Sequence, residues 1–297
     1  MALKSWIKAA RLRTLPLAVS CTIAGTAVAL INHQFDGLIF TFALVTTILL
    51  QVLSNFANDY GDFQKGTDQA ANRADRALAS GEVTPNKMKK AMIIFSVLSF
   101  ISGCVLLGIS FALDELILLG ALLVTGIFAI WAAIKYTSGA NAYGYKGLGD
   151  VFVFLFFGFV GVLGTQFLYI HTVLLESVLM VLVIGSLSTA VLNLNNMRDI
   201  NSDELAGKIT VPVRLGFKSS KTYHFLLFLM TWAGLLSLVA LHFNFVYALL
   251  LFPFLIHVKH LFFVSKCETP ELLDSELKKI ALSTFLISLI TLLSSFF

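Results

Sequence analysis

Long apolar stretches separated by short polar ones run along the whole chain. A helix needs about 20 mostly apolar residues to cross the hydrocarbon core of a bilayer. Nine stretches meet that requirement and contain no Asp or Glu: residues 15–32, 38–57, 91–113, 116–134, 151–168, 177–194, 222–241, 246–264 and 280–297. Small residues recur inside them, which favours close helix packing in lipid. The pattern therefore predicts an all-α polytopic membrane protein, a bundle of nine transmembrane helices.

The composition supports this prediction. The chain is 58% apolar and 13% charged, whereas a soluble domain is about 45–50% apolar and about 25% charged. Its net charge of +4 includes no dense basic tract interleaved with aromatic residues, which argues against nucleic-acid binding. The three Cys residues are widely spaced, so they indicate neither a zinc site nor a disulfide framework.

The basic residues predict the orientation of the chain. All 21 Lys and Arg residues lie in one alternating set of polar segments, namely 1–14, 58–90, 135–150, 195–221 and the region 257–279. Cytoplasmic loops carry the excess of Lys and Arg in membrane proteins. We therefore expect a cytoplasmic N-terminus and a C-terminus on the opposite side. The two long cytoplasmic loops, 58–90 and 195–221, are where we expect the chemistry.

Two clusters of Asn and Asp follow the second and sixth stretches. The first contains Asn55, Asn58, Asp59, Asp62 and Asp68, and the second contains Asn195, Asp199 and Asp203. If both helices continue, Asn55, Asp59 and Asp62 lie on one helix face, and so do Asn195, Asp199 and Asp203, because successive members are three or four residues apart. Neighbouring carboxylates become favourable when they share a hard cation, and Mg²⁺ prefers one or two carboxylates together with substrate phosphates. The clusters therefore predict two metal ions that bridge a diphosphate.

Basic residues near the clusters fit the same anion. They are Lys65, Arg73, Arg76, Lys146, Arg198 and Lys208. A connector over 136–150 is unusually rich in Gly and Tyr, and it contains Tyr145 and Asp150. We expect this connector to lie between the two acidic helix ends.

These motifs resemble those of the UbiA superfamily of intramembrane prenyltransferases. Asn58-Asp59-x-x-Asp62 with Asp68 resembles its first aspartate-rich motif, and Arg198-Asp199-Ile-Asn-Ser-Asp203 resembles its second. The segments 144–150 and 195–216, with Arg11-x-x-Thr14-Leu-Pro16, are most similar to the members that prenylate 1,4-dihydroxy-2-naphthoate for menaquinone synthesis.

The resemblance implies a single domain over 1–297, with nine helices around a central cavity in a bacterial inner membrane and an active site facing the cytoplasm. It implies transfer of a polyprenyl chain from polyprenyl diphosphate to 1,4-dihydroxy-2-naphthoate, with loss of diphosphate and CO₂ and with two Mg²⁺ ions. The expected catalytic residues are Asp59, Asp62, Asp199, Asp203 and Lys146. Those expected to bind diphosphate are Lys65, Arg73, Arg76, Arg198 and Lys208. Those expected to bind the acceptor are Arg11, Tyr145 and Asp150. Those expected to bind metal are Asn55, Asn58, Asp59, Asp62, Asp68, Asn195, Asp199 and Asp203.

Other functions remain open at this point. A related enzyme would use 4-hydroxybenzoate, homogentisate or a tetrapyrrole as its acceptor. A cation-coupled transporter is disfavoured because such proteins place ionisable groups near the bilayer midplane, whereas no acid lies inside a predicted span. A scaffold or lipid-binding protein would give the paired Asp clusters no purpose.

Overall fold

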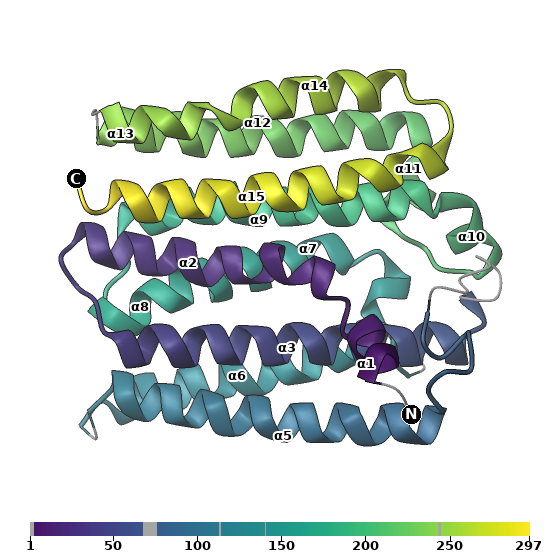
Figure 1. The fold of residues 1–297 in the computed structure, drawn as a ribbon, viewed down its shortest axis with the longest axis horizontal. Coiled ribbons are helices and arrows are strands. Elements are labelled where there is room, and N and C mark those ends of the chain that lie inside the picture. The colour runs from purple at the N-terminus through teal and green to yellow at the C-terminus, as the bar shows by residue number, and fades with distance from the viewer. Residues whose placement is uncertain (1–2, 68–75, 113, 140, 243–244) are drawn as a thin grey trace. The chain divides into compact units, whose positions relative to one another are not determined.

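The computed structural model describes residues 3–67, 76–112, 114–139, 141–242 and 245–297. Every regular element in that part of the chain is helical (Figure 1). The longer helices are α2 (Leu15–Ile31), α3 (Gly37–Gln64), α5 (Pro85–Ser110), α6 (Leu116–Lys135), α9 (Leu175–Arg198), α12 (Phe217–Leu241), α14 (Pro253–Lys266), α15 (Asp274–Ser294) and the π-helix η3 (Phe154–Gly164). The shorter ones are α1 (Leu3–Ala10), α7 (Gly149–Val153), α8 (Thr165–Ile170), α10 (Ile200–Leu205), α11 (Val211–Leu215), α13 (Phe245–Ala248) and the 3₁₀ turns η1 (Leu12–Thr14), η2 (Tyr143–Lys146), η4 (Leu249–Leu251) and η5 (Pro270–Leu273).

Nine helical segments among these described residues are long and apolar enough to cross a membrane. They are Leu3–Ile31, Gly37–Gln64, Pro85–Ser110, Leu116–Lys135, Gly149–Ile170, Leu175–Arg198, Phe217–Leu241, Phe245–Lys266 and Pro270–Ser294. Each overlaps one predicted stretch, so the prediction of an all-α protein with nine spanning helices is confirmed. The orientation of the termini stays a prediction.

The chain folds into two compact units, each built from three segments. Unit 1 comprises Met1–Leu15, Thr41–Gly149 and Asn201–Thr210, and unit 2 comprises Pro16–Phe40, Asp150–Ile200 and Val211–Phe297. Each unit has its own apolar core.

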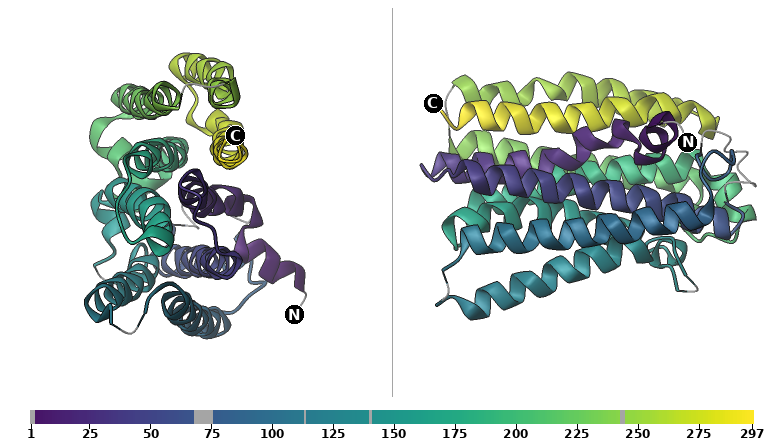
Figure 2. Two further views of the ribbon diagram at one scale, coloured as in Figure 1. Left: turned by 90° about the vertical axis from the view of Figure 1, so that its left-hand side faces the viewer. Right: turned by 60° about the horizontal axis from the view of Figure 1, so that its bottom comes forward.

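The core of unit 1 lies between α1, α3, α5 and α6. The ring of Phe56 on α3 meets Trp6 at 5.6 Å and Phe95 at 5.2 Å between centroids, both edge-to-face, an arrangement that aromatic pairs prefer. Figure 2 shows α5 and α6 running alongside each other, and the two helices are in contact. This packing holds the polar end of α3, which carries the first acidic cluster.

The core of unit 2 is centred on α9, which contacts α12, η3 and α15. Figure 1 shows α15 lying along α9. Leu187 and Leu194 of α9 are fully buried. A Cβ built on Gly158 would lie 3.4 Å from the Cα of Gly185, so η3 and α9 approach closely where both residues are glycine. The second acidic cluster therefore extends from a helix packed on several sides.

The two acidic clusters differ in their helices. Helix α3 continues to Gln64, seven residues past the predicted end of the apolar stretch, so Asn55, Asp59 and Asp62 do share one continuous helix. In contrast, α9 ends at Arg198, and Asp199 leaves the helical conformation with φ −95° and ψ 10°. The expectation that Asp203 continues the face of Asn195 and Asp199 is therefore wrong, because a new helix, α10, begins at Ile200.

Candidate active site

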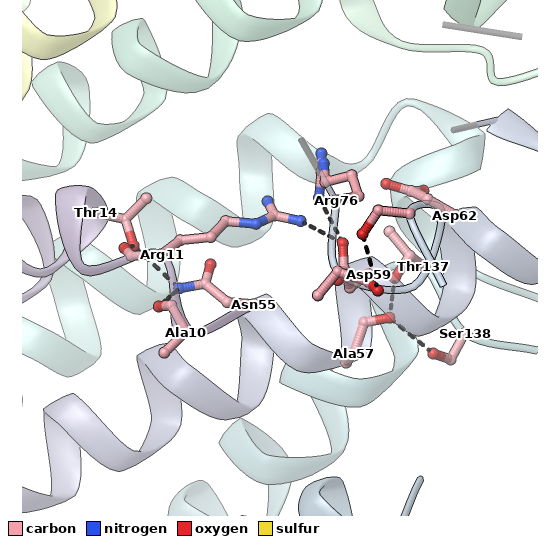
Figure 3. A network of polar contacts seen from close by, with 12 residues as sticks. Ala10, Arg11, Thr14, Asn55, Ala57, Asp59, Asp62, Arg76, Thr137 and Ser138 are labelled. Carbon is pink, nitrogen blue, oxygen red and sulfur yellow. Dashed lines mark hydrogen bonds and ion pairs between the residues drawn. The ribbon is translucent and has the colours of Figure 1, made fainter. Parts of the chain in front are cut away.

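Asp59 is the centre of the polar cluster in unit 1 (Figure 3). Its side chain is buried, and its Oδ1 accepts long contacts of 3.5 Å from Arg11 and 3.4 Å from Arg76. Both guanidinium groups are largely buried as well. A buried carboxylate needs such compensation because removing it from water is costly. The first motif therefore contains a carboxylate held between two cations.

Asn55 holds the N-terminal segment against α3. Its side-chain nitrogen donates to the carbonyl of Ala10 at 2.8 Å and to Oγ1 of Thr14 at 3.0 Å, as Figure 3 shows. Its Oδ1 accepts from Gln51 at 3.3 Å. Between Ala10 and Thr14, Arg11 adopts a left-handed backbone with φ 48°, a conformation that costs free energy and persists only where its surroundings enforce it. Asn55, expected among the metal ligands, thus lies where it positions Arg11.

Tyr145 connects the first motif to the Gly-rich connector. Its hydroxyl donates to Oδ1 of Asp62 at 2.8 Å and lies 2.6 Å from the hydroxyl of Thr67. The ammonium of Lys65 lies 3.5 Å from the centroid of the Tyr145 ring, a favourable cation–π distance. Burial, and next the charge of Asp62, raise the pKa of the Tyr145 phenol. Burial lowers the pKa of Lys65.

The end of the second motif also belongs to unit 1. Asp203 on α10 is buried and pairs with Lys208 at 3.3 Å. The ammonium of Lys208 lies 5.6 Å from the centroid of the Tyr145 ring, and the backbone N–H of Ile209 donates to the carbonyl of Tyr145 at 3.1 Å. Unit 1 therefore brings together Asp62 from the first motif and Asp203 from the second, with Tyr145 between the segments that carry them.

Arg198 and Asp199 form a separate cluster in unit 2. Nε and Nη2 of Arg198 donate to the two oxygens of Asp199 at 2.8 and 2.7 Å, and Nη2 also donates to Oδ1 of Asn195 at 2.8 Å. Nη1 donates to Asp274, the first residue of α15. The guanidinium, expected to bind diphosphate, thus has all three nitrogens directed at acceptors of the chain itself.

The remaining predicted residues lie in different surroundings. Asp150 is buried in unit 2, where it is hydrogen-bonded to Tyr223. Lys146 is exposed and donates to Asn141 at 3.0 Å. Asp68 and Arg73 fall outside the described residues.

Sequence reasoning missed three partners of these residues: Thr67, Tyr223 and Asp274. Thr67 lies between Asp62 and Asp68 of the first motif, so its hydroxyl was a signal available in the sequence. Tyr223 and Asp274 are separated from their partners by more than seventy positions along the chain, and no local pattern marks them.

Within the described part of the chain, several buried oxygens in or beside the two motifs have no hydrogen-bond donor. They are Oδ1 of Asn58, Oδ2 of Asp59 and Oδ1 of Asn196. Such oxygens usually have a partner, and oxygen atoms of this kind are the ligands that Mg²⁺ prefers. Among the described residues, no three His, Cys, Asp or Glu side chains are grouped closely enough to hold a metal by themselves. Oxygens such as those of Asn58 and Asp59 fit an ion that takes the rest of its ligands from water and phosphate.

Comparisons with known proteins show the family to which this chain belongs. The model of the UbiA prenyltransferase family matches residues 18–271. The 1,4-dihydroxy-2-naphthoate octaprenyltransferase of Haemophilus influenzae is 45% identical over 229 residues, 76% of this chain and 73% of the relative. The Escherichia coli protein of the same name is 43% identical over 242 residues, 80% of this chain and 78% of the relative.

A solved structure shares the fold. A UbiA homolog from Archaeoglobus fulgidus, bound to GPP and Mg²⁺, superposes with a TM-score of 0.65 at 13% identity, covering 97% of this chain and 99% of the other.

Proposed function

Because the chain belongs to the UbiA prenyltransferase family, we propose that it transfers a polyprenyl chain from polyprenyl diphosphate to 1,4-dihydroxy-2-naphthoate. The reaction releases diphosphate and CO₂. The observation that carries the choice of acceptor is the 43–45% identity to two proteins named for this acceptor, over more than three quarters of the chain. We propose that the two units, whose segments alternate along the sequence, together make up one domain.

The proposal includes Mg²⁺ as the cofactor, with two ions bridging the diphosphate. Support comes from the buried oxygens of Asn58 and Asp59, for which the described residues provide no donor, and from the carboxylates of Asp62, Asp199 and Asp203. When bound, the ions would offset the negative charge that develops on the leaving diphosphate. Asp68 would add a ligand on the first-motif side.

The basic residues would bind the oxygens of the diphosphate. The ammonium groups of Lys65 and Lys208 lie 3.5 and 5.6 Å from the centroid of the Tyr145 ring, and Arg76 contacts Asp59. Arg73 lies three residues before Arg76. Cations placed in advance where negative charge develops lower the barrier most effectively, because they need not reorganise during the reaction.

The acceptor would bind next to these groups. Arg11 is held in its left-handed backbone beside Asp59, and we propose that its guanidinium orients the carboxylate of the naphthoate. Tyr145, Asp150 and Lys146 complete the proposed acceptor contacts. The ring carbon that carries the carboxylate attacks the prenyl chain, and loss of CO₂ restores the aromatic ring.

The proposed place of the reaction is the cytoplasmic side of a bacterial inner membrane. All Lys and Arg residues lie in polar segments that alternate with basic-free ones. The proposed diphosphate ligands are among them, which supports a site open to the cytoplasm.

The acidic ligands give a direct test. In membranes supplied with polyprenyl diphosphate, 1,4-dihydroxy-2-naphthoate and Mg²⁺, Asp59→Asn and Asp203→Asn should reduce prenyl transfer by at least about a hundredfold, the scale of losing one preorganised charge-stabilising group. Glu204→Gln is the matched control, since Glu204 is an exposed neighbour of Asp203. Full activity in either Asp variant would contradict the proposed ligand set.

A further inference from the structure

Arg198 connects Asp199 to an acid that no motif includes. The guanidinium is buried, with its side chain 7% exposed, and it donates through Nε and Nη2 to both oxygens of Asp199. Through Nη1 it donates to Asp274. Paired bonds of this kind fix both the distance and the plane of the two groups. The orientation of Asp199 therefore depends on where Arg198 is held.

The charges in this cluster explain why a second acid matters. If Arg198 paired with Asp199 alone, the cation would neutralise the carboxylate and weaken its attraction for a metal ion. With Asp274 the cluster contains one cation and two anions, so a net negative charge remains. A nearby opposite charge favours the ionised form of such a carboxylate.

Asp274 is itself held firmly in unit 2. It begins α15, and Glu276 on the same turn is 1% exposed. Glu276 accepts from Nδ1 of His260 at 2.6 Å, and His260 in turn lies 2.8 Å from Nε2 of His224. These buried bonds tie the start of α15 to α14 and α12. Asp274 therefore meets Arg198 from a fixed helix end, although its own side chain is 58% exposed.

We propose that Asp274 is a positioning residue for the second aspartate-rich motif: it holds Arg198 so that Asp199 is oriented for a divalent cation and keeps its negative charge. This inference rests on the proposed function in so far as Asp199 is taken as a metal ligand. Residues that orient a metal ligand typically change metal affinity by about 10–100-fold when they are removed.

The test measures metal binding without substrate. Detergent-purified full-length protein is titrated with Mn²⁺, and free Mn²⁺ is followed by electron paramagnetic resonance. Asp274→Ala should weaken Mn²⁺ binding by about tenfold, whereas Asp274→Glu, which keeps the carboxylate, should restore binding to within about twofold of the wild type. Glu271→Ala is the matched control, because Glu271 is an exposed acid three residues away and its loss should leave Mn²⁺ affinity unchanged.

A double variant separates this role from a general loss of structure. If Asp274 acts through Arg198, adding Asp274→Ala to Arg198→Ala should weaken Mn²⁺ binding no further than Arg198→Ala alone. Additive losses, or an Asp274→Ala protein that binds Mn²⁺ like the wild type, would overturn the inference. A thermal unfolding curve for each variant shows whether it folds. If Asp274→Ala does not fold, Asp274→Glu decides the question. Mn²⁺ binding by Asp274→Glu as tight as that of Glu271→Ala supports the inference, and a tenfold weaker binding contradicts it.

The outcome is distinguishable from failure of the proposed function. If the wild type binds Mn²⁺ with the predicted pattern of variants but does not prenylate 1,4-dihydroxy-2-naphthoate, the acceptor assignment is wrong and the role of Asp274 stands. If prenyl transfer is confirmed but Asp274→Ala leaves Mn²⁺ binding unchanged, only the role of Asp274 is wrong.

Discussion

Tyr145 joins residues from three parts of the sequence, through its side chain and its backbone. It donates to Asp62, contacts the hydroxyl of Thr67, and lies beneath the ammonium of Lys65. Its backbone carbonyl accepts from Ile209, next to Lys208. One side chain thus aligns a carboxylate of the first motif while its ring contacts two proposed diphosphate ligands.

Replacing Tyr145 with Phe should isolate the contribution of its hydrogen bond to Asp62. Tyr145→Phe keeps the surface beneath Lys65 but removes the donor to Asp62, so kcat/KM for prenyl transfer should fall by about tenfold, the worth of one hydrogen bond to a charged group. Steady-state kinetics in detergent would measure this. Tyr60→Phe is the control, because its hydroxyl accepts an exposed bond from Gln64 on the same helix. Equal rates in both variants would show that the Asp62 contact is not used.

At the residue scale the sequence predicted the acids better than their partners. Asp59 and Asp62 were recognisable from their spacing, and the structure places them on one helix. The role of Asn55 in holding Ala10 and Thr14 was not recognisable, because those contacts join residues more than forty positions apart. Spacing along a helix reports which residues share a face, but it does not report what packs against that face.

At the scale of elements, α3 continues beyond its apolar stretch because its polar side chains are satisfied. Asn55, Asp59 and Asp62 all have partners in unit 1, so the helix does not need to end where the apolar residues do. Helix α9 instead ends at Arg198, where the side chain bonds to Asp199 at the helix terminus. Hydropathy placed the ends of the two apolar stretches at residues 57 and 194, and both helices continue past them, α3 by seven residues and α9 by four.

Gly61 shows how closely α3 approaches the connector after α6. A Cβ added there would lie 2.6 Å from the backbone carbon and oxygen of Thr137. The hydroxyls of Thr137 and Ser138 both donate to the carbonyl of Ala57, at 2.9 and 3.2 Å. The segment is therefore hydrogen-bonded to α3 at Ala57, two residues before Asp59.

Gly61→Ala should push this segment away and disturb the motif. We expect a loss of about 1–3 kcal/mol in stability, as is typical of overpacking, together with reduced prenyl transfer. Thermal unfolding in detergent and an activity assay would measure the two effects. Gly103→Ala on α5 is the matched control, since nothing lies within 4 Å of its added Cβ. Unchanged unfolding of Gly61→Ala would contradict the close approach.

The buried histidines hold the C-terminal helices of unit 2 together. His224, His260 and Glu276 are almost completely buried and bonded in series across α12, α14 and α15. His260→Leu would remove one of the two side chains that bond the buried carboxylate of Glu276, leaving Lys279 as the other, so the free energy of unfolding should fall by about 1–3 kcal/mol. Lys259→Leu, at an exposed position of the same helix, is the control. Equal unfolding temperatures would show that the series does not stabilise the unit.

At the scale of the whole molecule, the sequence predicted the number of spanning helices well. Each apolar stretch is long enough to cross a bilayer by itself, so the count needs no tertiary information. The division into two units was not predictable, because each unit draws on three segments far apart in the chain. The eleven-residue π-helix η3 within Gly149–Ile170 was also not predicted, since hydropathy does not distinguish it from an α-helix.

The proposed orientation is testable in whole cells. In a protein lacking its three native Cys residues, Gln34→Cys should react with a membrane-impermeant maleimide added outside an intact inner membrane. Lys218→Cys should react only after permeabilisation, because the basic segments are expected in the cytoplasm. The reverse labelling would invert the topology and place the acidic motifs on the outer side.

The central claim is the transfer of a polyprenyl chain to 1,4-dihydroxy-2-naphthoate, and a choice among acceptors tests it most directly. Purified protein with Mg²⁺ and one polyprenyl diphosphate would receive carboxyl-labelled 1,4-dihydroxy-2-naphthoate, 4-hydroxybenzoate or homogentisate in separate reactions. We predict a prenylated product and labelled CO₂ with 1,4-dihydroxy-2-naphthoate, in equal amounts, and no product with the other two. A prenylated product from 4-hydroxybenzoate or homogentisate, with none from the naphthoate, would contradict the account.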